Sequence, residues 1–364
     1  MLRAVLPCVL VLFLASCAGN SAGGGRETSS DVAALDRANP VLALPDTPLG
    51  LDMGLADLKP PPDPEQVRLG RWLYFDTRLS ADDTIACATC HLPEHGFSEP
   101  TPVSTGIRGQ KGGRKAPSFI NAAFAFYPET FWDGRAGSLE EQAAGPIENP
   151  IEMGFTHDAA VAAIDAVPAY KPFFAKSFGD ETVDIDRITR AIAAYERTRI
   201  SGNSAWDKWR DADDEDPDAA TVSAEVERGH ELFFGDAKCA TCHVGNSFTD
   251  SQYHNLGIGW DPATETFADE GRVVVSGKPE DTGAFKTPGL REVHLRAPYM
   301  HDGSVATLKD VVEHYRKGGT PNPHLSSKMF KLELTDADVD ALVAFMEALA
   351  GTGYMDAAPT LFPE

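Results

Sequence analysis

A short cysteine-histidine motif occurs twice in this chain and limits its possible folds more than any other feature. Both copies read Cys-Ala-Thr-Cys-His, and they comprise Cys87, Cys90 and His91, then Cys239, Cys242 and His243. In this motif the two thiols hold a porphyrin by thioether bonds, and the adjacent histidine takes one axial position on the iron. The chain is therefore predicted to fold around two covalent c-type haems.

Cysteine pairs with this spacing also occur in zinc sites and in thioredoxin-like redox sites. A zinc site built from both pairs would not require a histidine directly after the second cysteine of each pair. The repeated histidine therefore favours haem over these two alternatives.

The residues before the two motifs share a pattern, which indicates an internal duplication. A chain of 364 residues has room for about two domains. We expect an N-terminal haem domain over 63–210, an acidic linker over 211–222, a C-terminal cytochrome c domain over 223–351 and a tail over 352–364. The matching positions are Val67, Gly70, Leu73 and Phe75, then Val226, Gly229, Leu232 and Phe234.

The apolar spacing predicts a mainly α-helical fold with long loops and little strand. Helical stripes run from Ile185 to Tyr195 and from Val339 to Leu349, the second behind Thr335 as an N-cap. Another helix is expected from Asp63 to Phe75, with proline in its first turn. The best candidate for a strand is Arg272 to Ser276. Porphyrin faces would supply apolar area against which irregular loops can pack.

Residues 1–17 are expected to be a signal peptide of the lipoprotein type. Arg3 precedes an apolar run from Ala4 to Ala15, which is too short to span a bilayer as a mature helix. The segment ends in Leu-Ala-Ser-Cys, like a lipobox, so that Cys17 would carry a lipid anchor; an ordinary cleaved signal is the alternative. Residues 18–62, rich in Gly, Ser and Pro, are expected to form a flexible tether.

The cysteine count and the net charge limit compartment and partners. Of the six cysteines, Cys8 and Cys17 fall in the leader and four in the motifs, so none is left for a disulfide. Haem of the c type is attached outside the cytoplasm, so a periplasmic, membrane-anchored protein is expected. The formal charge of −23 makes nucleic acid an improbable partner. An acidic surface could steer a basic electron donor, although solubility is the commoner reason for such a charge.

Further motifs resemble those of the bacterial di-haem cytochrome c peroxidases and, within them, the MauG-like branch. The resemblance covers about residues 64–351. It implies that His91 ligates a peroxide-reacting haem and that His243 ligates a haem that stores and relays electrons. The segments that carry the resemblance are Phe131 to Arg135, Gln142 to Glu152, Gly283 to Pro288, Ala297 to Gly303 and His314 to Tyr315.

The resemblance also implies catalytic roles for three side chains. Glu152 matches the family's acid-base glutamate, which would move a proton between the two peroxide oxygens so that water can leave. Gln142 matches a position beside it in the pocket. Trp132 matches the tryptophan that lies between the two haems and couples them, with a large core aromatic as the alternative.

At the first haem, this chain has a different residue where many relatives have a regulatory ligand. They block this iron with a histidine, whereas the aligned position here is Ile107, which cannot bind iron. His95 is an alternative ligand, although it lies only four residues after His91. The first haem is therefore expected to be five-coordinate and reactive without prior reduction, as in the MauG-like branch.

At the second haem, Tyr315 stands where other family members place a methionine ligand. A phenolate is a hard anionic donor that stabilises oxidised iron, whereas a thioether favours reduced iron. Tyr315 is the expected second axial ligand, and Met300 and Met329 are the alternatives.

Family members usually hold a calcium ion between the haems, bound partly by an asparagine side chain. Lys115 stands at that position here, and a cation cannot ligate calcium. The other expected ligands are backbone carbonyls near Arg296 and Pro298. We expect the ammonium group of Lys115 to lie where the metal would be.

The leading functional prediction is an exported di-haem peroxidase that reduces hydrogen peroxide with electrons relayed from the second haem, supplied by a small redox protein. One alternative is a MauG-like oxidase that modifies side chains of a protein substrate. The maturase of that branch has a surface tryptophan where this chain reads Asp-Ala-Lys at 236–238, and Trp206 and Trp209 could provide another exit route. A second alternative, a non-catalytic electron carrier, predicts two six-coordinate haems.

Overall fold

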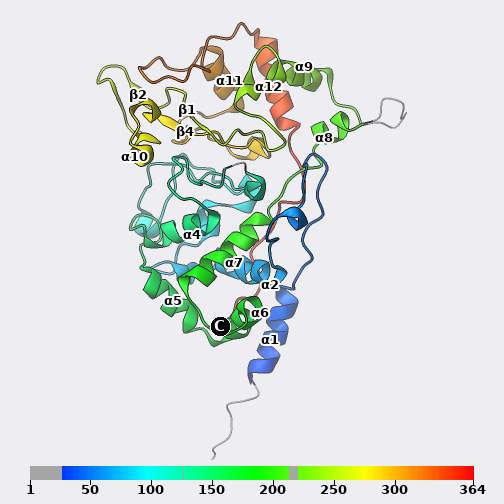
Figure 1. The fold of residues 1–364 in the computed structure, drawn as a ribbon, viewed down its shortest axis with the longest axis vertical. Coiled ribbons are helices and arrows are strands. Elements are labelled where there is room, and N and C mark those ends of the chain that lie inside the picture. Colours follow the sequence, from blue (N-terminus) through cyan, green and yellow to red (C-terminus); the bar gives the residue numbers. More distant parts are fainter. Residues whose placement is uncertain (1–26, 126, 213–219) are drawn as a thin grey trace, which may run out of the picture.

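The computed structural model describes residues 27–125, 127–212 and 220–364, and this part of the chain is mainly helical. Figure 1 shows the two halves of the chain one above the other, with the first half at the bottom. The first half contains α1 (Glu27–Ala38), α2 (Pro64–Phe75), α3 (Cys87–Cys90), α4 (Leu139–Glu148), α5 (His157–Asp165), α6 (Lys171–Phe178) and α7 (Ile185–Arg197). The second half contains α8 (Ala205–Arg210), α9 (Ala224–Phe234), α10 (Val273–Ser276), α11 (Leu308–Arg316) and α12 (Asp336–Glu347).

Strands are short and form two antiparallel pairs in the second half. In one pair β1 (Tyr253–Asn255) lies beside β4 (Ala284–Lys286), with Tyr253 opposite Lys286. The other pair joins β2 (Trp260–Asp261) to β3 (Thr266–Phe267). The prediction of a mainly α fold with little strand is therefore confirmed.

Each half has its own apolar core, built on a closely packed helix pair. In the first half α2 crosses α7, and in the second half α9 crosses α12. A Cβ on Gly70 would lie 1.8 Å from the carbonyl oxygen of Ala191, and one on Gly229 would lie 2.0 Å from that of Ala341. Each duplicated glycine thus lets the helix that precedes a haem motif touch its partner helix closely. This contact gives a physical reason for the glycine at the same place in both halves.

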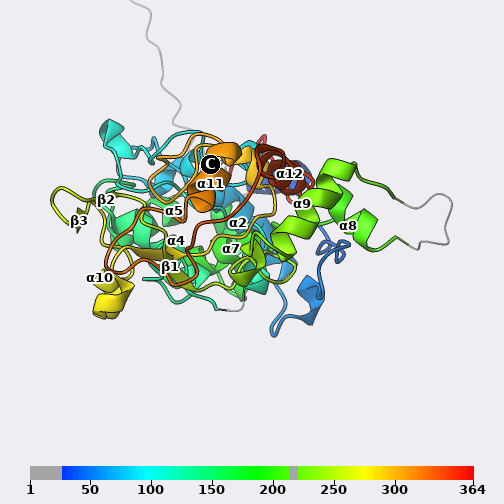
Figure 2. The ribbon, with the colours of Figure 1, turned by 90° about the horizontal axis from the view of Figure 1, so that it is seen from above.

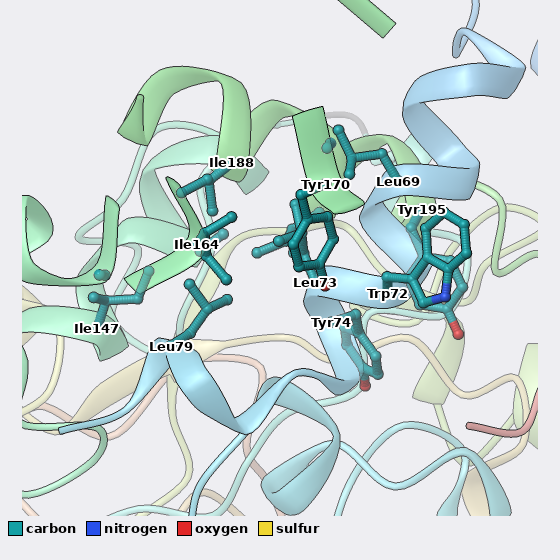
Figure 3. Close-up of a cluster of buried hydrophobic side chains, with 14 of the residues drawn as sticks. Leu69, Trp72, Leu73, Tyr74, Leu79, Ile147, Ile164, Tyr170, Ile188 and Tyr195 are labelled. Carbon is teal, nitrogen blue, oxygen red and sulfur yellow. The ribbon is translucent and has the colours of Figure 1, made fainter. Parts of the chain in front are cut away.

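The helix boundaries expected from capping are confirmed. Asp63 caps α2 by accepting a hydrogen bond from the amide of Glu65 at 2.8 Å. Thr335 caps α12 through the amide of Asp338 at 3.2 Å. The stripe on α7 is buried, and the rings of Tyr195 on α7 and Tyr74 on α2 lie 4.9 Å apart in the core that Figure 3 shows.

The expected tether over 18–62 is wrong from Glu27 onward. Residues 27–38 form α1, which buries Leu35 in the first core. The side chain of Asn39 donates to the carbonyl of Arg68 at 3.0 Å. The carbonyl of Gly50 accepts a hydrogen bond at 3.1 Å from Arg291 in the second half. These partners are remote in sequence, so local composition could not reveal them.

The expected signal peptide and the anchor at Cys17 lie outside the described residues, as do 213–219 of the expected acidic linker. Within the described part of the chain, every helix is too short or too polar to cross a membrane. The strand expected at 272–276 is wrong, because Val273–Ser276 forms the short helix α10.

The tail after residue 351 returns to the first half and packs along α2. Arg71 binds the carboxylate of Asp356 at 2.8 Å, and the indole nitrogen of Trp72 donates to the carbonyl of Leu361 at 2.9 Å. The two ends of the described chain therefore both brace the first haem domain.

Candidate functional site

The two motifs border two separate cavities. Cys87, Cys90 and His91 line a cavity of about 500 Å³ in the first half. The second motif lines a cavity of about 190 Å³ in the second half. Among the described residues, the four cysteines of the motifs form no disulfide. Paired thiols and a histidine on the wall of one cavity fit a covalently bound haem, and this donor set is present twice.

Both motif histidines make the same kind of hydrogen bond to a backbone carbonyl. The Nδ1 atom of His91 lies 3.1 Å from the carbonyl oxygen of Phe97, and Nδ1 of His243 lies 2.9 Å from that of Phe248. This bond leaves Nε2 free to ligate a metal. Burial lowers the pKa of both imidazoles, so both rings are neutral, as ligation requires.

The thiols do not have the character of a redox pair. Burial raises the pKa of Cys90 to about 11 and that of Cys239 to about 12. A reactive cysteine in a disulfide oxidoreductase has its pKa lowered instead. The environment therefore argues against a thioredoxin-like site.

Trp132 lines both cavities. Its indole nitrogen donates to the carbonyl of Lys115 at 2.8 Å, and its own carbonyl accepts from the amide of Lys286 at 2.8 Å. Since Lys286 belongs to β4, these bonds hold the tryptophan where the two halves meet. This is the position that an intermediary between two haems would need.

Glu152 and Gln142 both line the first cavity together with His91. A turn after α4 places Glu152, whose amide donates to the carbonyl of Asn149 at 3.1 Å. The side-chain amide of Asn149 donates to Oε1 of Glu152 at 2.9 Å. Burial raises the pKa of Glu152 and outweighs the opposing charge of Arg135. This carboxyl group can therefore hold a proton inside the cavity.

Ile107 is buried and is not among the described residues that line the first cavity. Its amide donates to the carbonyl of Glu152 at 2.8 Å, and its side chain fills the space beside Gly154. Of the described residues that line the first cavity, His91 is the one histidine, and His95 lies outside this lining. The loop at 107 thus supports the backbone of Glu152.

The expected second ligand and its two alternatives all line the second cavity. Tyr315 on α11, Met300 and Met329 all line it. Burial strongly raises the pKa of Tyr315, so its phenol stays protonated unless a cation compensates the charge of the phenolate. A haem iron at that oxygen would be such a cation.

Two histidines that the sequence did not single out also line the second cavity. His254 lies 2.9 Å from Asp250, and the ring of His301 stacks on Phe285 with 3.5 Å between centroids. His301 falls inside the motif at 297–303, which could have marked it. The sequence around His254 carries no comparable signal.

Glu196 is a further cavity residue that the sequence reasoning missed. It lies on α7, is only 4 % exposed and lines the first cavity. Its Oε2 atom has no hydrogen-bond partner among the described residues, and burial raises its pKa to about 8. The sequence did contain a signal for this burial, because Glu196 lies four residues after Ile192 and so continues the apolar stripe of α7.

Lys115 is buried against backbone oxygens. Its ammonium group contacts the carbonyl oxygen of Glu99 and lies 3.2 Å from that of Thr101. Burial lowers the pKa of Lys115 to about 8. A cluster of carbonyl oxygens around one cation is an arrangement that a metal ion also uses.

Fold and cavities together define a c-type cytochrome with two unequal haem sites. A family model described as di-haem cytochrome c peroxidase matches residues 64–215, and one described as cytochrome c matches 226–350. The methylamine utilization protein MauG of Methylorubrum extorquens is 39% identical over 295 residues, which are 79% of each chain. Cytochrome c551 peroxidase of Nitrosomonas europaea is 37% identical over 291 residues, 80% of this chain and 81% of its own.

A solved structure of a MauG-like protein associated with microbial copper homeostasis is 30% identical, with a TM-score of 0.73. It covers 89% of this chain and 97% of its own. The chain belongs to the di-haem cytochrome c peroxidase family. It is accordingly an oxidoreductase of the peroxidase type with two c-type haems.

Proposed function

We propose that this chain reduces hydrogen peroxide at its first haem site without prior reduction, in the manner of the MauG-like branch. The observation that carries the proposal is the composition of the first cavity. It combines His91 with a half-buried Glu152 whose pKa is raised, and it has no second histidine within its described lining. His91 would hold a haem there, and no other described histidine of the lining would compete with peroxide for its iron.

When bound, the haem iron supplies the redox chemistry that cleaves the bond between the peroxide oxygens. The protein's part is to move a proton. Glu152 takes a proton from one peroxide oxygen and returns it to the other, so that water can leave. Asn149 holds Oε1 of this carboxyl group in place, and the raised pKa makes the carboxylate a better base for the first transfer. Two electrons and two protons then complete the reduction of peroxide to two water molecules.

The electrons come from the second site, and Trp132 supports their passage because it borders both cavities. The proposed second ligand, Tyr315, would stabilise oxidised iron there. The physiological donor in this proposal is a small redox protein.

A second candidate function is the oxidation of side chains on a partner protein. It is favoured by Tyr315 at the second cavity and by two relatives named MauG, at 39% and 35% identity. In this case the partner protein replaces the redox protein as the source of electrons. A non-catalytic carrier would have no use for a protonatable Glu152 in an open cavity.

The proposal places the protein in the periplasm, anchored by a lipid on Cys17. It is supported by the leader sequence and by the attachment of c-type haem outside the cytoplasm. Membrane fractionation of a Cys17→Ala variant tests the anchor. Release into the soluble periplasmic fraction is expected, and unchanged membrane association would reject the lipid.

We also propose that Lys115 takes the place of an inter-haem calcium ion. Its ammonium group lies against the carbonyl oxygens of Glu99 and Thr101, where it supplies a positive charge. Metal analysis of the purified holoprotein should find less than stoichiometric calcium. One tightly bound calcium per chain would reject this replacement.

Rapid mixing of the oxidised holoprotein with one equivalent of peroxide tests the main proposal. Loss of the high-spin haem absorption without any reductant is expected. A reaction that begins only after reduction would indicate a gated peroxidase. No reaction under either condition would leave only the electron carrier.

A further inference from the structure

Trp206 lies in the second core beside the ligand of the second haem site. It is 1 % exposed, and its ring packs edge-on against Phe248 with 5.2 Å between centroids. The carbonyl of Phe248 is the hydrogen-bond partner of His243 Nδ1 at 2.9 Å. Phe248 alone therefore connects the expected haem ligand to the indole of Trp206.

The hydrogen bond of Trp206 sets it apart from the other described tryptophans. Its indole nitrogen lies 3.1 Å from Nδ1 of His230, and because an indole nitrogen can only donate, the imidazole accepts. Trp72 and Trp132 donate to backbone carbonyls, which cannot take up a proton. Of the tryptophans in the described part, Trp206 alone donates to a titratable side chain.

Two cations face the same indole ring. The guanidinium carbon of Arg210 lies 4.4 Å from the ring centroid, and that of Arg291 lies 5.9 Å from it. The charge of Arg291 is balanced by its buried ion pair with Asp207, so Arg210 is the cation that raises the cost of leaving a positive charge on an oxidised indole. Loss of an electron is therefore favoured when the N–H proton leaves with it, and His230 is placed to receive that proton.

The duplication shows that this pair belongs to the second half only. Alignment of Gly70 with Gly229 places Arg71 at the position of His230, and Arg71 binds Asp356. Beyond His230, the ring of the half-buried Trp209 lies 5.3 Å away and Phe234 is 45 % exposed. Figure 2 shows α8 and α9, which carry these residues, together at one side of the molecule.

We propose that Trp206 and His230 form a proton-coupled redox site, through which oxidising equivalents from peroxide reach the surface around Trp209. This inference rests on the proposed function. One electron leaves Trp206 for the oxidised second centre, while the indole N–H bond breaks and the proton binds Nδ1 of His230. An electron from a partner protein then restores the indole, and the proton returns. Two such cycles supply the two electrons that one hydrogen peroxide requires.

The pH dependence of this step follows from the charges around His230. Burial lowers the pKa of this imidazole, Glu231 opposes the shift and Arg210 adds to it. The neutral ring is the form that accepts a proton, so the rate should fall as the pH drops through the lowered pKa. His230→Asn keeps an acceptor oxygen near Nδ1 but removes the base, and should abolish this pH dependence.

The test uses the holoprotein, frozen at set times after one equivalent of peroxide, with electron paramagnetic resonance as the readout. Ring-deuterated tryptophan identifies the radical. Trp206→Phe should lower the tryptophan radical yield at least tenfold, and His230→Asn should slow its formation by a similar factor. Trp260→Phe, a tryptophan on β2 outside this cluster, is the matched control. Equal yields and pH profiles in Trp206→Phe and Trp260→Phe would overturn the inference.

Peroxide consumption in the same samples separates this inference from the proposed function. If Trp206→Phe consumes peroxide normally and gives the same radicals as the wild-type protein, the Trp206 site is rejected and the proposed peroxidase activity stands. If the wild-type protein does not consume peroxide, the proposed function fails, and a flash-generated ruthenium(III) oxidant replaces peroxide. Under that oxidant, the redox pair is supported if the tryptophan radical is lost in Trp206→Phe and forms more slowly in His230→Asn. It is rejected if both variants give the same radical signal as the wild-type protein.

Discussion

Glu152 and Glu148 lie four residues apart but in different surroundings, which makes them a matched pair for testing proton transfer. Glu152 lines the first cavity, whereas the side chain of Glu148 is 55 % exposed and faces His157. Glu152→Gln should slow the reaction of the oxidised protein with peroxide by about two to four powers of ten. Stopped-flow absorbance measures this rate, and Glu148→Gln should leave it unchanged. Equal rates in both variants would remove Glu152 from the mechanism.

Tyr315 is the second residue whose role can be isolated. If its oxygen ligates the second iron, Tyr315→Phe should change the low-spin absorption and paramagnetic spectra and leave the high-spin signal in place. Met329→Leu, at the same cavity, is the control. An unaltered low-spin spectrum in Tyr315→Phe, with a changed one in Met329→Leu, would transfer the ligand role to methionine.

Glu196 links stability to pH. Its pKa is raised to about 8 by burial, against 4.5 in the unfolded chain. Between these values the native protein binds more protons than the unfolded chain, so this residue makes the free energy of unfolding fall as the pH rises. Glu196→Gln should remove that contribution. The difference in unfolding free energy between variant and wild type should therefore shift in favour of the variant by about 1 to 3 kcal/mol from pH 5 to pH 8. Denaturant unfolding of the holoproteins at both pH values measures it, and parallel pH profiles would contradict it.

At the scale of elements, the helix crossings depend on the two duplicated glycines. A methyl group at Gly229 would lie 2.0 Å from the carbonyl oxygen of Ala341, so α9 and α12 would have to separate. Gly229→Ala should lower the free energy of unfolding by about 1 to 3 kcal/mol or more. Gly145→Ala, on α4, is the control, because the atom nearest its added Cβ, on the ring of Phe131, lies 3.5 Å away, which is an ordinary van der Waals distance. Equal stability of the two variants in denaturant unfolding would contradict this role of the crossing.

Elements with strong local signals could be predicted, and those without them could not. Caps and apolar stripes located α2, α7 and α12 because these signals lie within the helix itself. The three consecutive valines of Val273–Ser276 favoured a strand, but Gly271 and Gly277 at either side adopt positive φ values of 66° and 68°. These two turns leave room for one helical turn only.

For the whole molecule, the sequence predicted the two haem sites but not how the chain closes around them. His91 and His243 each line a cavity, and their role as iron ligands stays a prediction from the motif. The bracing by residues 27–62 and by the tail was not predictable, since Asp356 and Arg71 are remote in sequence. The Oε2 atom of Glu196, which has no hydrogen-bond partner among the described residues, is likewise buried by segments from elsewhere in the chain.

The most direct test of the central claim is the low-temperature paramagnetic resonance spectrum of the resting, fully oxidised holoprotein. One haem site should be open opposite His91 and the other closed by ligands on both faces. The spectrum should therefore contain one high-spin and one low-spin ferric signal in equal amounts. Two low-spin signals, with no high-spin iron, would contradict an open peroxide site and with it the proposed activity.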